Sequence, residues 1–343
     1  MANVESGMNV LVLTDTAHDE RVWQAVMSIV ADCGAEPTIA LFDPRPADYY
    51  NPPKTVCKAM LESDVNVLLA TTGMLHCEAA SEAMAKGVPS LCMDGGMTLE
   101  MFQTGAVTAD YSEIARLKFR VASLVFGGAA KSVRVTSGFG TDLTYSVEDR
   151  VYVPPEPRGN RDPLRAYRRA EEGRKTSLFA CVYPTGEFNI PPVEGSANGV
   201  AVIDLTMHRF GRLASPIELE VRDGRITRIT GGAEASELET YLARYGDDNA
   251  YCFPTEASIG LNPVARVTGN QREDKNIFGS IHFGLGTNID VGGTLRSKIH
   301  MDGIVLKPTV YVDGKERIRD GKFLVDLGLR QPPAPAAATE ARR

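Results

Sequence analysis

The sequence lacks the features that would assign it to a membrane or to a nucleic acid. It contains no apolar run near the roughly 20 residues that a membrane-spanning helix needs, and its N-terminus has no basic stretch followed by an apolar run and a cleavage site. Basic residues are the minority, with 37 Lys and Arg against 44 Asp and Glu and a formal net charge of −7. A clustered cationic surface for nucleic acid or anionic lipid is therefore not expected. These absences predict a soluble cytoplasmic enzyme with a small-molecule substrate.

Cysteine and the common nucleotide-binding motifs are also scarce. The chain has six cysteines and no CxxC pair, and 343 residues of which 43% are hydrophobic can build a core without disulfides. We therefore expect reduced thiols. No GxGxxG leads from a strand into a helix, and no Walker loop or GxSxG elbow occurs. Dinucleotide-binding, P-loop and serine-hydrolase chemistry thus have no support in the sequence.

The first 130 residues alternate short apolar runs with amphipathic helical patterns. This rhythm is typical of a parallel sheet covered by helices. It predicts strands over 10–14, 38–42, 65–70 and 90–93, and helices over 22–33, 77–86 and 111–126. We therefore expect a parallel α/β domain over residues 1–130.

From residue 131 the pattern changes to strands and hairpins. Residues 217–229 alternate apolar and polar side chains around Asp223-Gly224, which is the strongest short-range signal for a tight hairpin. We expect a β-rich α+β domain over residues 131–330. The Pro- and Ala-rich segment 331–343 cannot build a core, and the sequence predicts a disordered tail there.

The five histidines are few enough to consider one by one. His300 and Asp302 form an HxD triplet, and two residues with this spacing on a strand point to the same face. That spacing suits two metal ligands, although the triplet also occurs by chance in many proteins. His282 lies beside Phe283, where a histidine is more often a hydrogen-bonded interior residue than a ligand.

Two glutamates lie in unusual surroundings. Glu187 in YPTGEFN and Glu256 in YCFPTEASIG are flanked by Pro, Gly and aromatic residues, which predict a strand end or a tight loop. A carboxylate in such a place needs a partner, because an unpaired buried charge is strongly penalised. Together with His282, His300 and Asp302 they would form a site for one or two Zn, Mn, Co or Fe ions. Salt bridges to arginines such as Arg266 are the alternative.

His76 follows a predicted strand and lies at the start of a predicted helix. Open α/β sheets present their ligand-facing loops at such positions. The position predicts a proton shuttle or a substrate contact, and a surface helix N-terminus explains it equally well. We include His76 with Glu187 and Glu256 among the candidate catalytic residues.

Four blocks follow one another between residues 177 and 315. They are GEF with Pro191 and EGS, then Glu256 before IGLNP, then SIHFGLG, then HMD. In this order they resemble the aminopeptidase T family of metallopeptidases (M29). The resemblance implies that the two glutamates, the two histidines and the aspartate ligate a pair of divalent metal ions, with Glu256 as the bridge. It also implies a homodimer.

One position departs from the peptidase pattern. The peptidases have a catalytic Tyr seven residues after the histidine that corresponds to His282, and this chain has Ile289 there. An isoleucine cannot give a hydrogen bond or a proton to a developing oxyanion. The resemblance therefore does not carry peptide hydrolysis over to this chain, and we expect the scissile bond to be a small amide, peptide-like or ring C–N bond.

The same superfamily includes the 2,5-dihydroxypyridine 5,6-dioxygenases, which hold one Fe(II) through two His and one Asp. The resemblance implies that His300 and Asp302 form one end of such a site, with His76 as acid or base. The remaining His of those enzymes falls where this chain has Glu256, and a Glu, His, Asp set is more anionic unless His282 supplies the second imidazole.

This substitution favours hydrolysis over oxygen chemistry. We therefore expect a metal-dependent hydrolase in which metal-activated water attacks the substrate and Glu187 or Glu256 accepts its proton. A dioxygenase that opens a hydroxylated nitrogen heterocycle is the second hypothesis. A non-catalytic descendant that keeps the fold is the third.

Overall fold

The computed structural model describes residues 4–127, 129–150, 180–289 and 291–329, and the predicted tail over 331–343 lies outside these ranges. Within them, no helix has both the length and the apolar character that crossing a membrane would require. All six cysteines carry free thiols, as the sequence predicts.

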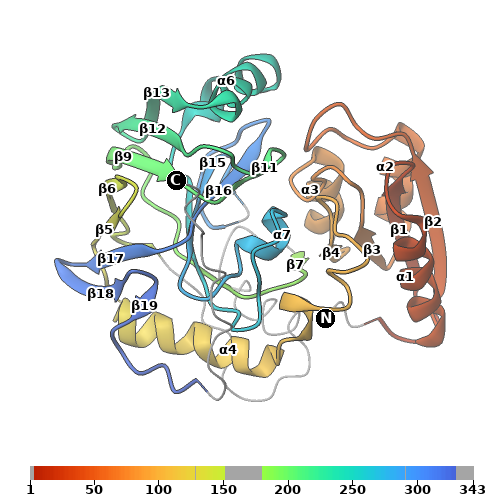
Figure 1. The fold of residues 1–343 in the computed structure, drawn as a ribbon. Coiled ribbons are helices and arrows are strands. Elements are labelled where there is room, and N and C mark those ends of the chain that lie inside the picture. The colour runs from red at the N-terminus through yellow and green to blue at the C-terminus, as the bar shows by residue number, and fades with distance from the viewer. Residues whose placement is uncertain (1–3, 128, 151–179, 290, 330–343) are drawn as a thin grey trace.

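The first part of the chain forms a parallel sheet with helices between its strands, as predicted (Figure 1). The strand order is β2-β1-β3-β4-β7. The strands are β1 (Asn9–Asp15), β2 (Glu36–Phe42), β3 (Val65–Leu68), β4 (Ser90–Cys92) and β7 (Ala180–Val182). The connecting helices are α1 (Glu20–Asp32), α2 (Lys54–Glu62) and α3 (Glu78–Ala85). Because β7 pairs with β4 from far along the chain, the division at residue 130 stays a prediction.

Local sequence explains where the helices begin and end. The Asp19 side chain accepts a hydrogen bond from the Arg21 backbone N–H at the start of α1, and Gly34 follows the helix with φ +76°, which favours glycine. The helix α4 (Tyr111–Arg120) begins after Asp110, whose side chain caps it. It continues as the π-helical segment η2 (Val121–Val125), so the predicted helix over 111–126 is two segments.

The second part contains two antiparallel sheets. The six-stranded sheet has the order β11-β10-β16-β15-β14-β8. Its strands are β8 (Glu187–Asn189), β10 (Thr206–Met207), β11 (Gly211–Arg212), β14 (Glu256–Gly260), β15 (Ile281–Gly286) and β16 (His300–Val305). The eight-stranded sheet has the order β13-β12-β9-β6-β5-β17-β18-β19. Its strands are β5 (Ser132–Ser137), β6 (Asp142–Ser146), β9 (Asn198–Ile203), β12 (Ile217–Arg222), β13 (Arg225–Gly231), β17 (Pro308–Val312), β18 (Lys315–Arg319) and β19 (Lys322–Phe323).

The predicted hairpin is present between β12 and β13. Asp223 and Gly224 both have positive φ, 49° and 70°, which is the geometry of a tight hairpin turn. The remaining helical segments are η1 (Gly105–Thr108), α6 (Ala233–Tyr245), η3 (Asp248–Tyr251) and α7 (Gln271–Asp274).

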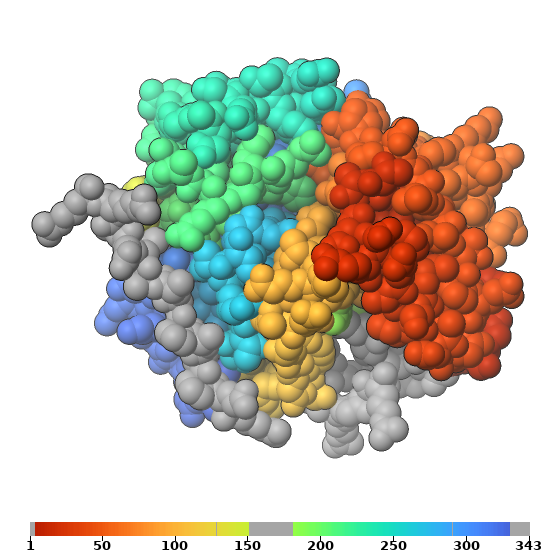
Figure 2. Space-filling model, turned by 45° about the vertical axis from the view of Figure 1, so that its right-hand side comes forward, coloured from red at the N-terminus to blue at the C-terminus, as the bar shows by residue number. Residues whose placement is uncertain are grey.

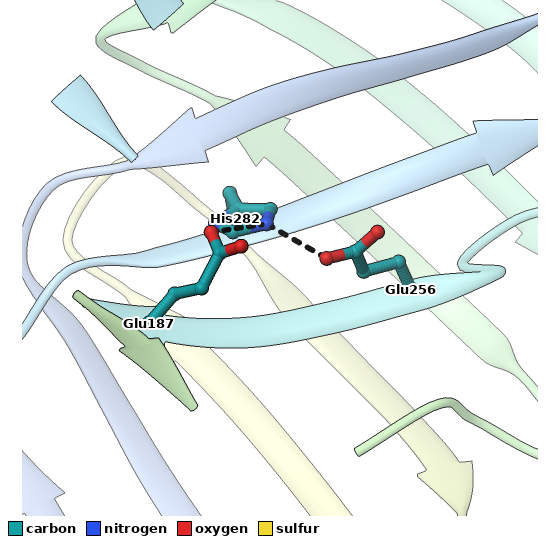
Figure 3. Close-up of side chains that lie close together, drawn as sticks. All are labelled: Glu187, Glu256 and His282. Atoms are coloured by element: carbon teal, nitrogen blue, oxygen red, sulfur yellow. Dashed lines mark hydrogen bonds and ion pairs between the residues drawn. The ribbon is translucent and has the colours of Figure 1, made fainter. Parts of the chain in front are cut away.

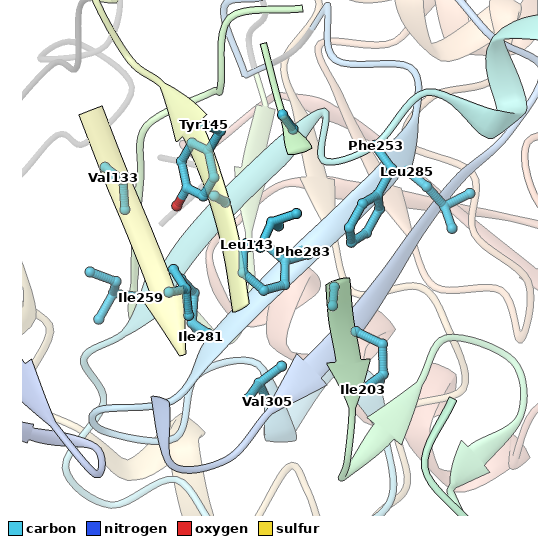
Figure 4. Packing of buried hydrophobic residues seen from close by; sticks show 14 of the residues in the cluster. Val133, Leu143, Tyr145, Ile203, Phe253, Ile259, Ile281, Phe283, Leu285 and Val305 are labelled. Carbon is cyan, nitrogen blue, oxygen red and sulfur yellow. The ribbon is translucent and has the colours of Figure 1, made fainter. Parts of the chain in front are cut away.

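The hydrophobic core of the second part lies between its two sheets (Figure 4). Ile281, Phe283 and Leu285 of β15 point into it and meet Leu143 and Tyr145 of β6. The residues that alternate with them on β15 point to the opposite face of the six-stranded sheet. Every residue of β15 is buried, so this opposite face is covered as well.

The first part of the chain contributes to that cover. Arg272 of α7 forms a buried ion pair with Asp94, which follows β4. In Figure 2 the two parts are packed against each other, with the cyan segment that includes α7 beside the orange segment that follows β4. The polar face of the six-stranded sheet therefore lies in the interior of the molecule.

Candidate metal centre

The five predicted ligands lie on four adjacent strands of the six-stranded sheet. Glu256 on β14 and Asp302 on β16 lie opposite the same residue of β15, Gly284. His300 lies opposite Gly286, two residues further along β15. Pairing and the period of two therefore place these side chains on one face of the sheet.

The ligand atoms form two overlapping groups. His282 Nε2 lies 3.2 Å from Glu256 Oε1 and 3.7 Å from Glu187 Oε2 (Figure 3). His300 Nε2 lies 3.1 Å from Glu256 Oε2 and 3.0 Å from Asp302 Oδ1. Within each group the ligand atoms lie within 4.8 Å of one another, and Glu256 belongs to both. The structure thus brings together all five residues that the sequence singles out, and they could hold a metal ion.

The hydrogen bonds of His300 indicate a cation at this position. Its Nδ1 lies 2.7 Å from the Thr287 carbonyl oxygen, which only accepts, so Nδ1 carries a hydrogen. A neutral ring then directs the Nε2 lone pair at two carboxylate oxygens, those of Glu256 and Asp302. Such an arrangement needs a proton or a metal ion on Nε2. Burial lowers the pKa of His300, but the two carboxylates outweigh it and hold this pKa well above its usual range.

Gly284 leaves the space that an ion would need. A Cβ atom at this position would lie 2.9 Å from both Glu256 Cβ and His300 Cε1, and 3.3 Å from Asp302 Oδ1. Any larger residue would therefore fill the centre of the group. Nitrogen and carboxylate oxygen donors around such a space suit Fe, Zn, Mn or Co ions.

Polar neighbours hold the carboxylates in place, and the sequence interpretation missed them. Asn189 Nδ2 donates to Glu256 Oε1 at 2.6 Å, and Ser258 Oγ donates to the same oxygen at 3.0 Å. Gln271 donates to Asp302 Oδ2. Asn189 and Ser258 each stand two residues after a predicted ligand, Glu187 and Glu256. Side chains two residues apart on a strand point to the same face, so this spacing could have identified both residues from the sequence.

A buried lysine provides the positive charge beside the carboxylates. Lys275 Nζ lies 3.2 Å from Glu187 Oε2 and 3.8 Å from Asp302 Oδ2. The alternative of pairing with Arg266 is wrong, because its guanidinium lies 3.3 Å from Glu100 Oε1 instead. The sequence interpretation missed Lys275 because nothing local marks it as a partner.

His76 also reaches the site, from the loop between β3 and α3. Its ring centroid lies 4.8 Å from that of His300, and Tyr49 packs edge-on against it at 4.8 Å. Burial, and secondarily the charge of His300, lower the pKa of His76 to about 3. The ring is therefore neutral near pH 7.

One carboxylate links the loop of His76 to helix α7. Asp94 Oδ2 accepts hydrogen bonds from the backbone N–H groups of Met74 at 2.5 Å and Leu75 at 3.1 Å. Its Oδ1 pairs with Arg272. The position of His76 relative to the polar face is thus fixed by buried, charge-assisted hydrogen bonds.

Comparison with known proteins identifies a family. The family model of NicX, 2,5-dihydroxypyridine 5,6-dioxygenase, matches residues 1–325. A 2,5-dihydroxypyridine 5,6-dioxygenase from Pseudomonas putida is 30% identical over 153 residues, which cover 40% of this chain and 43% of that protein. The aligned region therefore spans less than half of that relative.

Solved structures show the same fold. The 2,5-dihydroxypyridine dioxygenase of Pseudomonas putida KT2440 superposes with a TM-score of 0.68 at 20% identity, over 95% of this chain and 94% of the other. Wild-type AmpT from Thermus thermophilus gives 0.61 at 13% identity, over 94% and 96%. These matches confirm the predicted parallel α/β part followed by β-rich sheets, and they show that the likeness to AmpT extends to the fold.

The prediction of a hydrolase is wrong, because the family model that matches nearly the whole chain is that of a dioxygenase. The physical reason is that nitrogen and carboxylate donors bind Fe, Zn and Mn alike, so Glu256 does not decide the reaction. Ile289, which stands where the peptidases have their catalytic tyrosine, is partly buried. The chain therefore has no phenol at this position. The chain belongs to the 2,5-dihydroxypyridine 5,6-dioxygenase family.

Proposed function

We propose that this protein is an Fe(II)-dependent dioxygenase that opens the ring of a hydroxylated nitrogen heterocycle with molecular oxygen. The observation that carries the proposal is the family match over residues 1–325. The convergence of two imidazoles and three carboxylates on one buried face supports it. Both oxygen atoms would enter the product, so no reductant is consumed.

Four of the five converging residues would hold the iron: His282, His300, Glu256 and Asp302. Two imidazoles with carboxylates are a donor set that ferrous iron accepts in oxygenases. The chemistry that the ion supplies when bound is electron exchange between dioxygen and an electron-rich ring. The Thr287 carbonyl fixes the tautomer of His300, and Asn189 and Ser258 orient Glu256.

His76 would accept the proton of a ring hydroxyl group only where the bound ion makes that group strongly acidic, because burial lowers the pKa of His76 to about 3. Its neutral imidazole lies against His300, so a substrate beside the ligands would be within its reach. Loss of the hydroxyl proton makes a ring more electron-rich, which favours attack on oxygen. Tyr49 restricts the orientation of the His76 ring. Glu187 is paired with Lys275 and is not assigned to proton transfer.

The two parts of the chain would together exclude water from the reaction. Glu256, His282, His300 and Asp302 are each at most 4% exposed. A dry site strengthens the hydrogen bonds and ion pairs inside it. The small-molecule substrate and the homodimer both remain predictions.

The test is oxygen consumption coupled to loss of the substrate. The purified protein is loaded anaerobically with Fe(II) and mixed with air-saturated buffer and 2,5-dihydroxypyridine, while an oxygen electrode and the ring absorbance are followed. We expect one O2 per ring opened, and no turnover after loading with Zn(II). Loss of the substrate without oxygen uptake, or no reaction with any hydroxypyridine, would contradict the proposal.

A variant of His76 separates metal binding from proton transfer. His76→Gln keeps a polar side chain of similar size but cannot take up a proton. We expect kcat to fall by roughly 100-fold with the metal content unchanged. An unaltered kcat would remove His76 from the mechanism.

A further inference from the structure

The polar face carries more negative charge than one metal ion needs. Three carboxylates, those of Glu187, Glu256 and Asp302, converge with two imidazoles. The two ligand groups that share Glu256 would in geometry admit two ions, one in each group. The number of bound ions therefore depends on the other charged side chains at this face.

Lys275 lies at the group that contains Glu187. Its side chain is 7% exposed, and its ammonium contacts Glu187 Oε2 at 3.2 Å and Asp302 Oδ2 at 3.8 Å. The residue follows α7 directly, and its backbone N–H donates to the Gln271 carbonyl at 3.2 Å. Arg272 anchors the same helix to Asp94. The ammonium is thus held in place by the fold.

Charge balance then favours a single ion. Three carboxylates and one ammonium leave two negative charges, which one divalent ion neutralises. A second divalent ion would leave two uncompensated positive charges in a buried site, which is strongly unfavourable. An ion on Glu187 Oε2 would also lie within a few ångströms of the ammonium, where repulsion between like charges is large.

We propose that Lys275 takes the place of a second cation on Glu187 and so limits this site to one divalent metal ion. The inference rests on the proposed metal-dependent function and concerns the number of ions. Glu256, His282, His300 and Asp302 are left to hold that ion. Lys275 is in this sense a residue that determines metal stoichiometry, without touching the metal.

A second lysine, partly buried and with its charge also acting on Glu187, offers a matched control. Lys118 of α4 donates from Nζ to Thr185 Oγ1 at 3.1 Å, and no ion pair with a candidate ligand is seen for it among the described residues. Replacing either lysine by methionine removes one ammonium whose charge acts on Glu187. Only the Lys275 variant removes the direct ion pair with that carboxylate.

The experiment counts bound ions. Metal-free wild type, Lys275→Met, Lys275→Arg and Lys118→Met are equilibrated with excess Mn(II), and manganese per chain is measured by elemental analysis and native mass spectrometry. We expect one ion in the wild type, Lys275→Arg and Lys118→Met, and two in Lys275→Met. Electron paramagnetic resonance should show an isolated Mn(II) signal in the wild type and a coupled pair in Lys275→Met.

Other ion counts would contradict either the role of Lys275 or the proposed metal-dependent function. Two ions in the wild type, one ion in Lys275→Met, or two ions in Lys118→Met would overturn the inference. No ion in any variant would instead contradict the proposed metal-dependent function. If Lys275→Met does not fold, Lys275→Gln, which removes the charge but keeps a polar end group, serves as the second test. We expect two ions in this variant as well, because Glu187 again loses its ammonium partner, and a single ion in it would overturn the inference.

Discussion

The two faces of the six-stranded sheet use the same strands for opposite purposes. On β15, Phe283 and Leu285 point into the core, whereas His282 and Gly284 point to the polar face. Both faces are buried, with Phe283 and His282 each 0% exposed. Burial alone therefore does not distinguish a residue that stabilises the fold from one that binds a ligand. The alternation of side chains between the two faces of β15 makes this distinction.

This separation has an energetic consequence. Apolar side chains on the core face contribute free energy by leaving water. Charged side chains on the polar face cost free energy unless cations and hydrogen bonds compensate them. Substitutions on the two faces should therefore affect different measurements, and the following predictions test that difference.

The largest effect is expected from a ligand on the polar face. His300→Ala removes the imidazole that faces both Glu256 and Asp302. We expect metal content near background and oxygen uptake reduced at least roughly 1,000-fold, with the circular dichroism spectrum of the folded protein retained. Elemental analysis and the oxygen electrode provide the measurement. Full metal content in this variant would contradict the assignment of metal binding to the polar face.

The matching change on the core face should have the opposite outcome. Phe283→Ala leaves a cavity between the sheets, and we expect the free energy of unfolding to fall by about 3–5 kcal/mol. Denaturant unfolding of the metal-free protein measures this loss. At a temperature where the variant is folded, its metal content should equal that of the wild type. Loss of metal with unchanged stability would contradict the assignment of the two faces.

A smaller effect is expected from a residue that supports a ligand. Gln271→Leu removes the donor to Asp302 Oδ2 while keeping a similar volume. We expect the metal affinity to fall by about 10–100-fold, as for other residues that orient ligands. Competition with a chelator gives the affinity. An affinity equal to that of the wild type would show that Asp302 needs no such support.

The smallest effect concerns a carboxylate for which the structure describes no cationic partner. Asp204 follows β9 and accepts a hydrogen bond from the Leu306 backbone N–H at 2.9 Å. Burial raises its pKa from 3.8 to about 6. The folded state therefore prefers the protonated form, and the wild type loses stability as the pH rises from about 4 to above 6.

Asp204→Asn keeps the acceptor and stays neutral. We expect this variant to be more stable than the wild type by about 1–2 kcal/mol at pH 8 and equal to it below about pH 4. Urea unfolding across this pH range measures the difference. A difference that does not change with pH would show that ionisation of Asp204 is not its cause.

Local patterns carried much of the prediction from sequence. Hydrophobic period and turn residues predicted the α/β part, the change to strands and the hairpin at Asp223-Gly224. The order of four sequence blocks predicted which five residues converge. The parallel pairing of β7 with β4 depends on a contact between distant segments, and no local pattern encodes it.

The parts of the site that were missed depend on register and on short elements. Gly284 acquires its importance only from lying between Glu256 and Asp302 across the sheet. Gln271 and Lys275 lie on or directly after a helix of four residues, which is too short for a helical period to be visible. The reaction class was predicted wrongly because these donor atoms serve several metals.

The central claim is that the polar face of the six-stranded sheet binds one ferrous ion. Anomalous diffraction at the iron edge, from crystals prepared anaerobically with Fe(II), tests it most directly. We predict a single peak beside His300 Nε2 and Asp302 Oδ1. Iron found only elsewhere in the molecule, or no peak on this face at full occupancy of Fe(II) in solution, would contradict the claim.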